Sequence, residues 1–379
     1  MSEAGEPRGP GHRRRYTATV ASARLGPSVP VRRPRVCILH VGGTIGMTRT
    51  IDGLVPVPGV LERYLAAMPE LHGADVPLHH LERLDPLLDS ADMGPRDWVR
   101  IARAILERDS EFDGFVVLHG TDTLVYTASA LSFLLTGLRK PIVVTGSQLS
   151  LEHVRSDGRE HIITSLIIAG TLPIPEVCIY FASRLLRGNR TQKIHNSDFV
   201  AFGSGNLPPL ATVGVGISVH DHLVRKPGAG LPATVELVRE PHVGTLRVFP
   251  GISAAVIEGL LAAPIDGAVL ESYGAGTFPS DADLIDPIRA ATSREPPAIV
   301  VNCSQCHGGI VRQDEYRGGR KLTAAGVTSG HDMTPEAALT KLYCLLALGL
   351  PHERVRALMG TDLAGELDPR ATVREDAWA

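Results

Sequence analysis

The 379-residue chain is predicted to be an α/β protein of two domains, because short apolar runs alternate along it with stretches of helical periodicity. Two of these runs, 35–41 and 115–118, lead directly into glycine-containing turns. A short apolar run closed by glycine is typical of a strand in a parallel sheet. The length fits two domains of roughly 150 residues each, and an apolar content of 44% permits a sizeable core.

Further strands and two clear helices follow in order. The other predicted strands are 141–145, 177–181, 267–270 and 298–301. A helix is predicted over 95–107, where Pro95 stands in the first turn and apolar residues recur on one face. The residues of this face are Trp98, Ile101, Ile105 and Leu106. The last predicted helix begins at Thr334, a capping residue followed by Pro335, and ends at Gly349.

Glycine, proline and charged residues concentrate between about residues 214 and 241, so this stretch is the best candidate for a domain boundary. We therefore predict a larger N-terminal domain over 35–215, a linker over 216–240 and a smaller C-terminal domain over 241–362. Residues 363–379 are polar and acidic, and we expect them to form a loose tail.

Residues 1–34 differ in composition from the rest, being rich in arginine, proline, glycine and serine. We expect a disordered basic arm without a catalytic role, or a start codon placed too early; a role in targeting or nucleic-acid binding is the alternative. The arginines are not followed by an apolar segment of the length found in signal peptides. The chain is therefore expected to be cytoplasmic.

Composition argues against several classes of function. The net charge of −3 and an aromatic content of 4% do not favour a nucleic-acid or anionic-membrane partner. The sequence contains no apolar run of about 18 residues, the length of a membrane span. The five cysteines are sparse and odd in number, which argues against a disulfide framework.

The candidate catalytic residues follow the first two predicted strands. Thr44 lies in a glycine-rich turn after 35–41, and Thr121 and Asp122 follow 115–118. In parallel sheets, ligands bind past the carboxyl ends of the strands, so these side chains are expected to converge at one mouth. A threonine hydroxyl is a usable nucleophile when a nearby group takes its proton. The alternative interpretations are structural: the glycines of 42–46 would only permit a tight turn, and Thr121 and Asp122 would only cap a helix.

A second motif, Cys303-Ser304-Gln305-Cys306-His307, matches the pattern of covalent haem attachment. Such attachment requires export and an axial ligand, and a zinc site would need a second pair of ligands, which the sequence does not supply. We therefore interpret these thiols as structural or incidental. No metal site is predicted.

In its motifs the chain resembles the L-asparaginase family, specifically the cytosolic type I branch. The resemblance covers residues 35–362, and the evidence is the joint occurrence of motifs in order. They are G-G-T-I-G at 42–46, D-S-A-D-M at 89–93, H-G-T-D-T at 119–123, T-G-S-Q at 145–148, R-G-N-R-T-Q-K at 187–193, N-L-P-P-L at 206–210 and G-H-D-M-T at 330–334. The resemblance implies a larger N-terminal α/β domain with a mixed, mostly parallel sheet and a smaller C-terminal Rossmann-like α/β domain. It also implies hydrolysis of L-asparagine to L-aspartate and ammonia, without metal or organic cofactor.

The resemblance assigns a role to each matching residue. Thr44 matches the nucleophile, which forms a β-aspartyl ester. Thr121 matches the second threonine, Asp122 the buried acid and Lys193 the lysine paired with it, a set that relays a proton from attacking water. Backbone N–H groups of the glycine-rich turns would hold the oxyanion, and Asp89 and Ser90 would hold the α-amino and α-carboxylate groups. The positions that match substrate-binding residues are Gly43, Asp89, Ser90, Gly120 and, at the border of the pocket, Ser147.

The sequence departs from the family pattern at three places. Leu54 stands where many relatives carry a tyrosine in the mobile loop after the nucleophile. Tyr316 matches a tyrosine that serves instead in some type I relatives, and its alternative reading is an exposed loop tyrosine. Ala91 and Thr277 replace common polar residues, which implies backbone binding of the carboxylate at Ala91 and different contacts at Thr277.

The resemblance also implies a homodimer or homotetramer, because the family completes its sites across subunits. Some type I relatives bind asparagine at an allosteric site, which would lie near Gln305 and Cys306 here. The rivals are a related amidase, either a glutaminase or the D subunit of the tRNA-dependent amidotransferase, and a non-catalytic regulatory binder of asparagine. That D subunit carries an extra folded N-terminal domain, for which residues 1–34 are too short and too poor in apolar residues.

Overall fold

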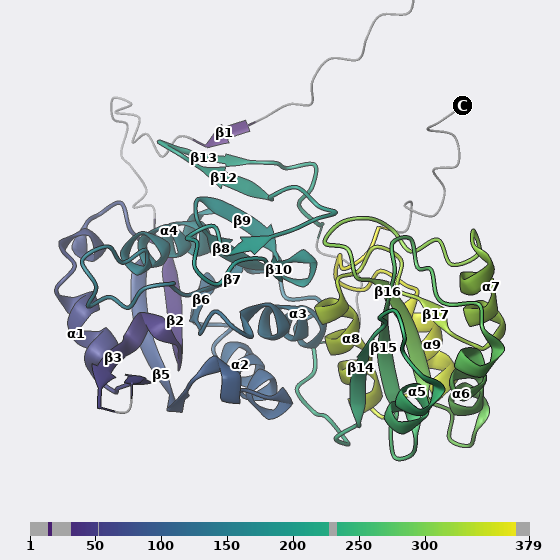
Figure 1. The fold of residues 1–379 in the computed structure, drawn as a ribbon. Helices are drawn as coiled ribbons and strands as arrows, with labels where there is room; N and C mark the ends of the chain where they lie inside the picture. The colour runs from purple at the N-terminus through teal and green to yellow at the C-terminus, as the bar shows by residue number, and fades with distance from the viewer. Residues whose placement is uncertain (1–13, 17–31, 52, 227–232, 369–379) are drawn as a thin grey trace, which may run out of the picture.

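The computed structural model describes residues 14–16, 32–51, 53–226 and 233–368. Two α/β units lie side by side, the larger built from the N-terminal half of the chain and the smaller from the C-terminal half (Figure 1). The expected fold class, two α/β domains of unequal size, is confirmed. Among the described helices, none has the length and apolarity needed to cross a membrane.

The larger unit is organised around a nine-stranded sheet with the order β1-β13-β12-β9-β8-β7-β6-β2-β5. Strands β8, β7, β6, β2 and β5 are parallel to one another, whereas β9, β12, β13 and β1 run antiparallel to their neighbours. Its strands are β1 (Arg14–Tyr16), β2 (Arg35–Gly42), β5 (Leu78–Leu88), β6 (Gly114–Leu118), β7 (Ile142–Thr145), β8 (Val177–Phe181), β9 (Arg184–Arg187), β12 (Ala211–Val213) and β13 (Ile217–Val219).

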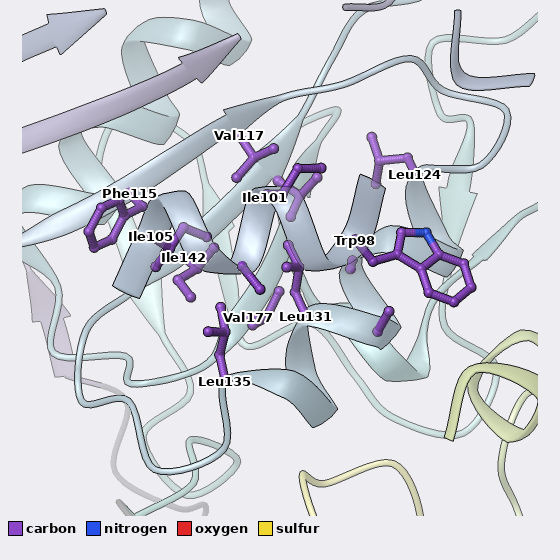
Figure 2. Packing of buried hydrophobic residues seen from close by; sticks show 14 of the residues in the cluster. Trp98, Ile101, Ile105, Phe115, Val117, Leu124, Leu131, Leu135, Ile142 and Val177 are labelled. Atoms are coloured by element: carbon purple, nitrogen blue, oxygen red, sulfur yellow. The ribbon is translucent and has the colours of Figure 1, made fainter. Parts of the chain in front are cut away.

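Helices cover both faces of this sheet, and strand β6 shows why. Successive side chains of a strand point to opposite faces; Phe115 and Val117 join one apolar cluster, and Val116 and Leu118 join the other. Helices α2 and α3 cover the first face, as Figure 2 shows, and α1 and α4 cover the second. The helices are α1 (Val60–Ala66), α2 (Pro95–Glu107), α3 (Leu124–Leu134) and α4 (Gly158–Thr171). The helix predicted over 95–107 is confirmed by α2.

The smaller unit is a four-stranded parallel sheet, in the order β14-β15-β16-β17, with helices on both faces. Its strands are β14 (Val243–Arg247), β15 (Gly267–Ser272), β16 (Ile299–Ser304) and β17 (Thr328–Ser329). Its helices are α5 (Ala254–Leu261), α6 (Ala282–Ser293), α7 (Arg317–Ala324), α8 (Pro335–Ala347) and α9 (His352–Met359). The predicted cap at Thr334 is confirmed, since its hydroxyl accepts a hydrogen bond from the N–H of Ala337 at 3.1 Å.

Short elements complete the loops around the larger sheet. They are the hairpin of β3 (Met47–Thr50) and β4 (Gly53–Pro56), the pair β10 (Gln192–Lys193) and β11 (Phe202–Gly203), and the 3-10 turns η1 (Thr44–Gly46), η2 (Pro69–His72), η3 (Ser90–Asp92) and η4 (Gly188–Arg190).

The described ends of the two units differ from the predicted boundaries. Strand β13 belongs to the large sheet, although it falls inside the predicted linker 216–240. Strand β1 pairs with β13 although it falls inside the predicted arm, and Arg32 forms an ion pair with Asp113 at 2.8 Å. The predicted loose tail is wrong for residues 363–368, because Glu366 and Leu367 are buried. Residues 1–13, 17–31, 52, 227–232 and 369–379 lie outside the described part of the chain.

Candidate active site

Three loops meet at the carboxyl ends of β2, β5 and β6, the place predicted for the site. The N–H of Gly43 donates to the carbonyl oxygen of Leu88 at 3.2 Å. A Cβ atom on Gly43 would lie 2.3 Å from the backbone nitrogen of Gly120, and one on Gly120 would lie 2.5 Å from Oγ of Ser90. Only glycine permits these approaches, and at Gly43 a φ of 88° adds the same requirement.

Thr44 begins the 3-10 turn η1 immediately after β2. The turn is held from both sides: the N–H of Gly46 donates to the carbonyl of Gly43 at 3.2 Å, and the N–H of Leu151 donates to that of Ile45 at 3.3 Å. Ile45 is fully buried, whereas Thr44 is half-buried. The turn therefore fixes Thr44 at the mouth, where a ligand can reach it.

Lys193 links the two polar residues that follow β6. Its Nζ donates to Oγ1 of Thr121 at 3.0 Å and to Oδ1 of Asp122 at 2.5 Å. Thr121 is buried, and the side chain of Lys193 is 18% exposed. The expectation of a buried acid is wrong for the isolated chain, because the side chain of Asp122 is 66% exposed. Thr121, just before α3, is thus buried, whereas Asp122 is open to solvent.

His119, which precedes these residues, stabilises the turn. The ring is buried, and burial lowers its pKa to about 4, so the imidazole is neutral at neutral pH. Its Nδ1–H donates to the carbonyl of Gly120 at 2.7 Å, because a carbonyl can only accept, and its Nε2 accepts from the hydroxyl of Thr127 at 2.8 Å. A neutral histidine with both ring nitrogens hydrogen-bonded thus fixes the backbone of the turn.

The residues matched to substrate binding fall into two groups. Asp89 is exposed and caps η3 by accepting from the N–H of Ala91 at 3.1 Å. Ser90 is buried beneath Gly120, and its carbonyl accepts from the hydroxyl of Thr123 at 2.7 Å. Ser147 is also buried, and its hydroxyl donates to the carbonyl of Leu149 at 2.6 Å. Asp89 thus reaches the mouth directly, whereas the two serine side chains lie beneath its surface.

Sequence reasoning missed Asp157, which organises the loop after β7. Its carboxylate accepts from the N–H of Gln148 at 2.9 Å and from that of Leu149 at 3.1 Å. Gln148 in turn donates from its side chain to the carbonyl of Asp198 at 2.9 Å. An Asp-Gly pair before a helix gives no signal of this role, because it is equally typical of an ordinary turn.

Tyr316 does not approach Thr44 within the same chain. It precedes α7, and Figure 1 places α7 at the opposite end of the molecule from β3, which follows Thr44. Tyr316 is 48% exposed. Leu54, at the position of the expected loop tyrosine, is an exposed residue of β4. The hydroxyl of Tyr316 could therefore reach Thr44 only from a second copy of the chain.

The C-x-x-C-H motif lies in the smaller unit. Cys303 is buried in β16, and burial raises the pKa of its thiol, whereas Cys306 is exposed. Nδ1 of His307 lies 2.8 Å from Oε1 of Gln192. Within the described residues, no group of three or more His, Cys, Asp or Glu side chains is arranged to hold a metal ion.

Comparisons with known proteins cover both units of the fold. Residues 35–225 match the family model "Asparaginase, N-terminal", and residues 242–359 match "Glutaminase/Asparaginase C-terminal domain". L-asparaginase 1 of Escherichia coli is 43% identical over 339 residues, which cover 89% of this chain and 99% of that protein. The 60 kDa lysophospholipase of Mus musculus is 41% identical over 89% of this chain and 63% of its own length.

The crystal structure of L-asparaginase I from Vibrio cholerae superposes with a TM-score of 0.80 at 43% identity, covering 89% of this chain and all of that one. The two family models and the structural match therefore cover both units of the fold and indicate the same family. The chain belongs to the asparaginase family.

Proposed function

We propose that this protein is an L-asparaginase that hydrolyses the side-chain amide of L-asparagine to L-aspartate and ammonia. The observation that carries the proposal is Lys193, which holds both Thr121 and Asp122 beside the turn of Thr44. An ammonium group, a carboxylate and a hydroxyl in one hydrogen-bonded set can direct a proton to or from a reacting atom.

In the first half-reaction, Oγ1 of Thr44 attacks the amide carbon, and the proton that it loses as the C–O bond forms is transferred to the leaving nitrogen. Backbone N–H groups of the Gly43 and Gly120 turns stabilise the oxyanion. The C–N bond then breaks and ammonia leaves, so that a β-aspartyl ester remains on Thr44. The exposed carboxylate of Asp89 binds the α-ammonium group of the substrate.

In the second half-reaction, water attacks the ester. The set of Thr121, Asp122 and Lys193 accepts the proton of the water as the new C–O bond forms. Breakage of the ester releases aspartate, and the proton taken from the water returns to Oγ1 of Thr44. The overall change is one water consumed and one ammonia released.

We further propose that the site is completed by a second copy of the chain in a homodimer or homotetramer. In the single chain Asp122 is largely exposed, and helix α7, which Tyr316 precedes, lies at the opposite end of the molecule from β3 (Figure 1). A partner's C-terminal unit would cover the mouth and bring its own tyrosine. The free state of all five cysteines favours the cytoplasm as the place of action.

The test is ammonia release from L-asparagine, L-glutamine and D-asparagine by the wild type and by Thr44→Ala. We expect turnover of L-asparagine, and a loss of several orders of magnitude in kcat for Thr44→Ala. Thr171→Ala is the matched control, since it removes a threonine hydroxyl that donates to Ile167 at the end of α4. An acid-quenched reaction should carry an aspartyl adduct on the peptide that contains Thr44.

Each rival predicts a different result. A glutaminase would prefer L-glutamine, and an amidotransferase subunit would release no ammonia from free asparagine. A regulatory binder would bind asparagine, measurable by calorimetry, without turnover. More than a few per cent of wild-type activity in Thr44→Ala would remove Thr44 from the role of nucleophile.

A further inference from the structure

Lys193 is poorly supported by the large sheet. It ends β10, a strand of two residues that pairs only with β11. Figure 1 shows β10 on the side of the larger unit that faces the smaller one. The position of Nζ relative to Thr121 therefore depends in part on the turn η4, which lies just before β10.

The side chains of this turn bind the C-terminal end of the described chain, residues 362–368, which we call the strap. Arg187 donates to the carbonyl of residue 365 at 3.3 Å, Asn189 to that of residue 364 at 2.9 Å, and Arg190 to that of residue 366 at 2.6 Å. All three side chains are buried. Arg187 at the end of β9 and two residues of η4 thus bind three successive carbonyls of the strap.

The strap is itself firmly anchored in the smaller unit. The carboxylate of Glu366 pairs with Nζ of Lys341 at 2.5 Å, and both side chains are 0% exposed. Lys341 also donates to the carbonyls of Met359 at 3.2 Å and Thr361 at 2.6 Å, so that each of its three protons has an acceptor. Leu367 packs into the apolar cluster under α8 and α9.

A second contact ties the same turn to the smaller unit. Arg190 pairs with Asp332 at 2.5 Å, and the other carboxylate oxygen of Asp332 accepts from the N–H of Asp368 at 2.9 Å. The turn that precedes Lys193 is therefore held by side chains and backbone from 140 to 180 residues later in the chain.

We propose that the strap is a positioning element for catalysis: by holding Asn189 and Arg190, it sets the distance from Nζ of Lys193 to Thr121 and Asp122. The inference rests on the proposed role of Lys193 in the reaction. A misplacement of about 1 Å in a catalytic group can lower the rate by about 100-fold. Loosening the strap should therefore reduce kcat much more than it changes KM.

The first test is Asn189→Leu, which keeps the volume but removes the donor to the carbonyl of Ala364. The matched control is Thr292→Val, which removes a buried hydroxyl that donates to the carbonyl of Ala325 at 2.6 Å and touches neither the strap nor the site. We expect both variants to lower Tm similarly. Only Asn189→Leu should lower kcat, by about tenfold or more, with KM changed less than about threefold.

A second variant changes the strap and leaves the turn intact. Gly365 has a φ of 84°, and a Cβ there would lie 2.8 Å from Cδ of Arg225 and 3.0 Å from both Cδ and the guanidinium carbon of Arg187. Gly365→Ala should therefore push the strap away from the turn and reproduce the pattern of Asn189→Leu. If Asn189→Leu does not fold, this variant decides the question.

The final step places Asn189→Leu in a Lys193→Met background. If the strap acts through Lys193, the double variant loses no more kcat than Lys193→Met alone. Wild-type kcat in Asn189→Leu and Gly365→Ala, despite a lowered Tm, would overturn the proposal, as would a further loss in the double variant. A Lys193→Met enzyme with normal kcat would instead refute the proposed function of Lys193, a separate result.

Discussion

The pair of Lys341 and Glu366 allows a sharp test of what anchors the strap in the smaller unit. Both side chains are 0% exposed, and Nζ lies 2.5 Å from the carboxylate. Removing one partner of a buried ion pair leaves an uncompensated charge and typically costs about 3–5 kcal/mol. Lys341→Met does this to Glu366, and it also removes the donor to the carbonyls of Met359 and Thr361.

We therefore expect Lys341→Met to lose about 3–5 kcal/mol of unfolding free energy, which at roughly 2–4 °C per kcal/mol lowers Tm by about 10 °C. The assay is urea unfolding followed by circular dichroism, with calorimetry for Tm. The control is the double variant Lys341→Met/Glu366→Gln, which removes the buried charge and keeps an acceptor for the N–H of Leu363. It should recover at least about 1 kcal/mol. A loss below about 1 kcal/mol in the single variant, or a double variant less stable than the single one, would refute the reasoning.

Three further predictions concern the site and the response to pH. Asp122→Asn and Lys193→Met should each nearly abolish turnover, and the double variant should be little worse, because one hydrogen-bonded set fails as a unit; losses that multiply would contradict this. Tyr316→Phe should lower kcat more than it raises KM. Tyr64 is a half-buried residue of α1, and Tyr64→Phe should change neither constant much. Normal kcat in Tyr316→Phe would remove the tyrosine from the reaction. Burial lowers the pKa of His40 from 6.5 to about 4, so below pH 6.5 the unfolded state binds a proton that the native state does not, and stability falls with acid. His40→Phe should flatten that fall by about 1.4 kcal/mol per pH unit; unfolding curves between pH 5 and pH 7 with an unchanged slope would exclude His40 as a cause.

Local sequence determined much of the fold. The apolar run 115–118 predicts strand β6, and the spacing of Trp98, Ile101 and Ile105 predicts helix α2, because both patterns reflect burial that the element's own periodicity imposes. The position of Thr44 after a strand and a pair of glycines predicts a residue at the sheet's mouth. These features depend on neighbours in sequence, so they can be read without knowing the rest of the chain.

Only the tertiary structure decided how the site is supported. No local pattern indicates that Asn189 and Arg190 bind carbonyls of residues 364 and 366, or that Glu366 is buried against Lys341. The polar composition of 363–368 suggested a loose tail, because charged residues are seldom buried unless they find partners. Those partners lie far away in sequence, and so does Lys193, whose contact with Asp122 spans 71 residues. Sequence patterns record which residues suit an element, whereas the meeting of two charges depends on how the whole chain packs.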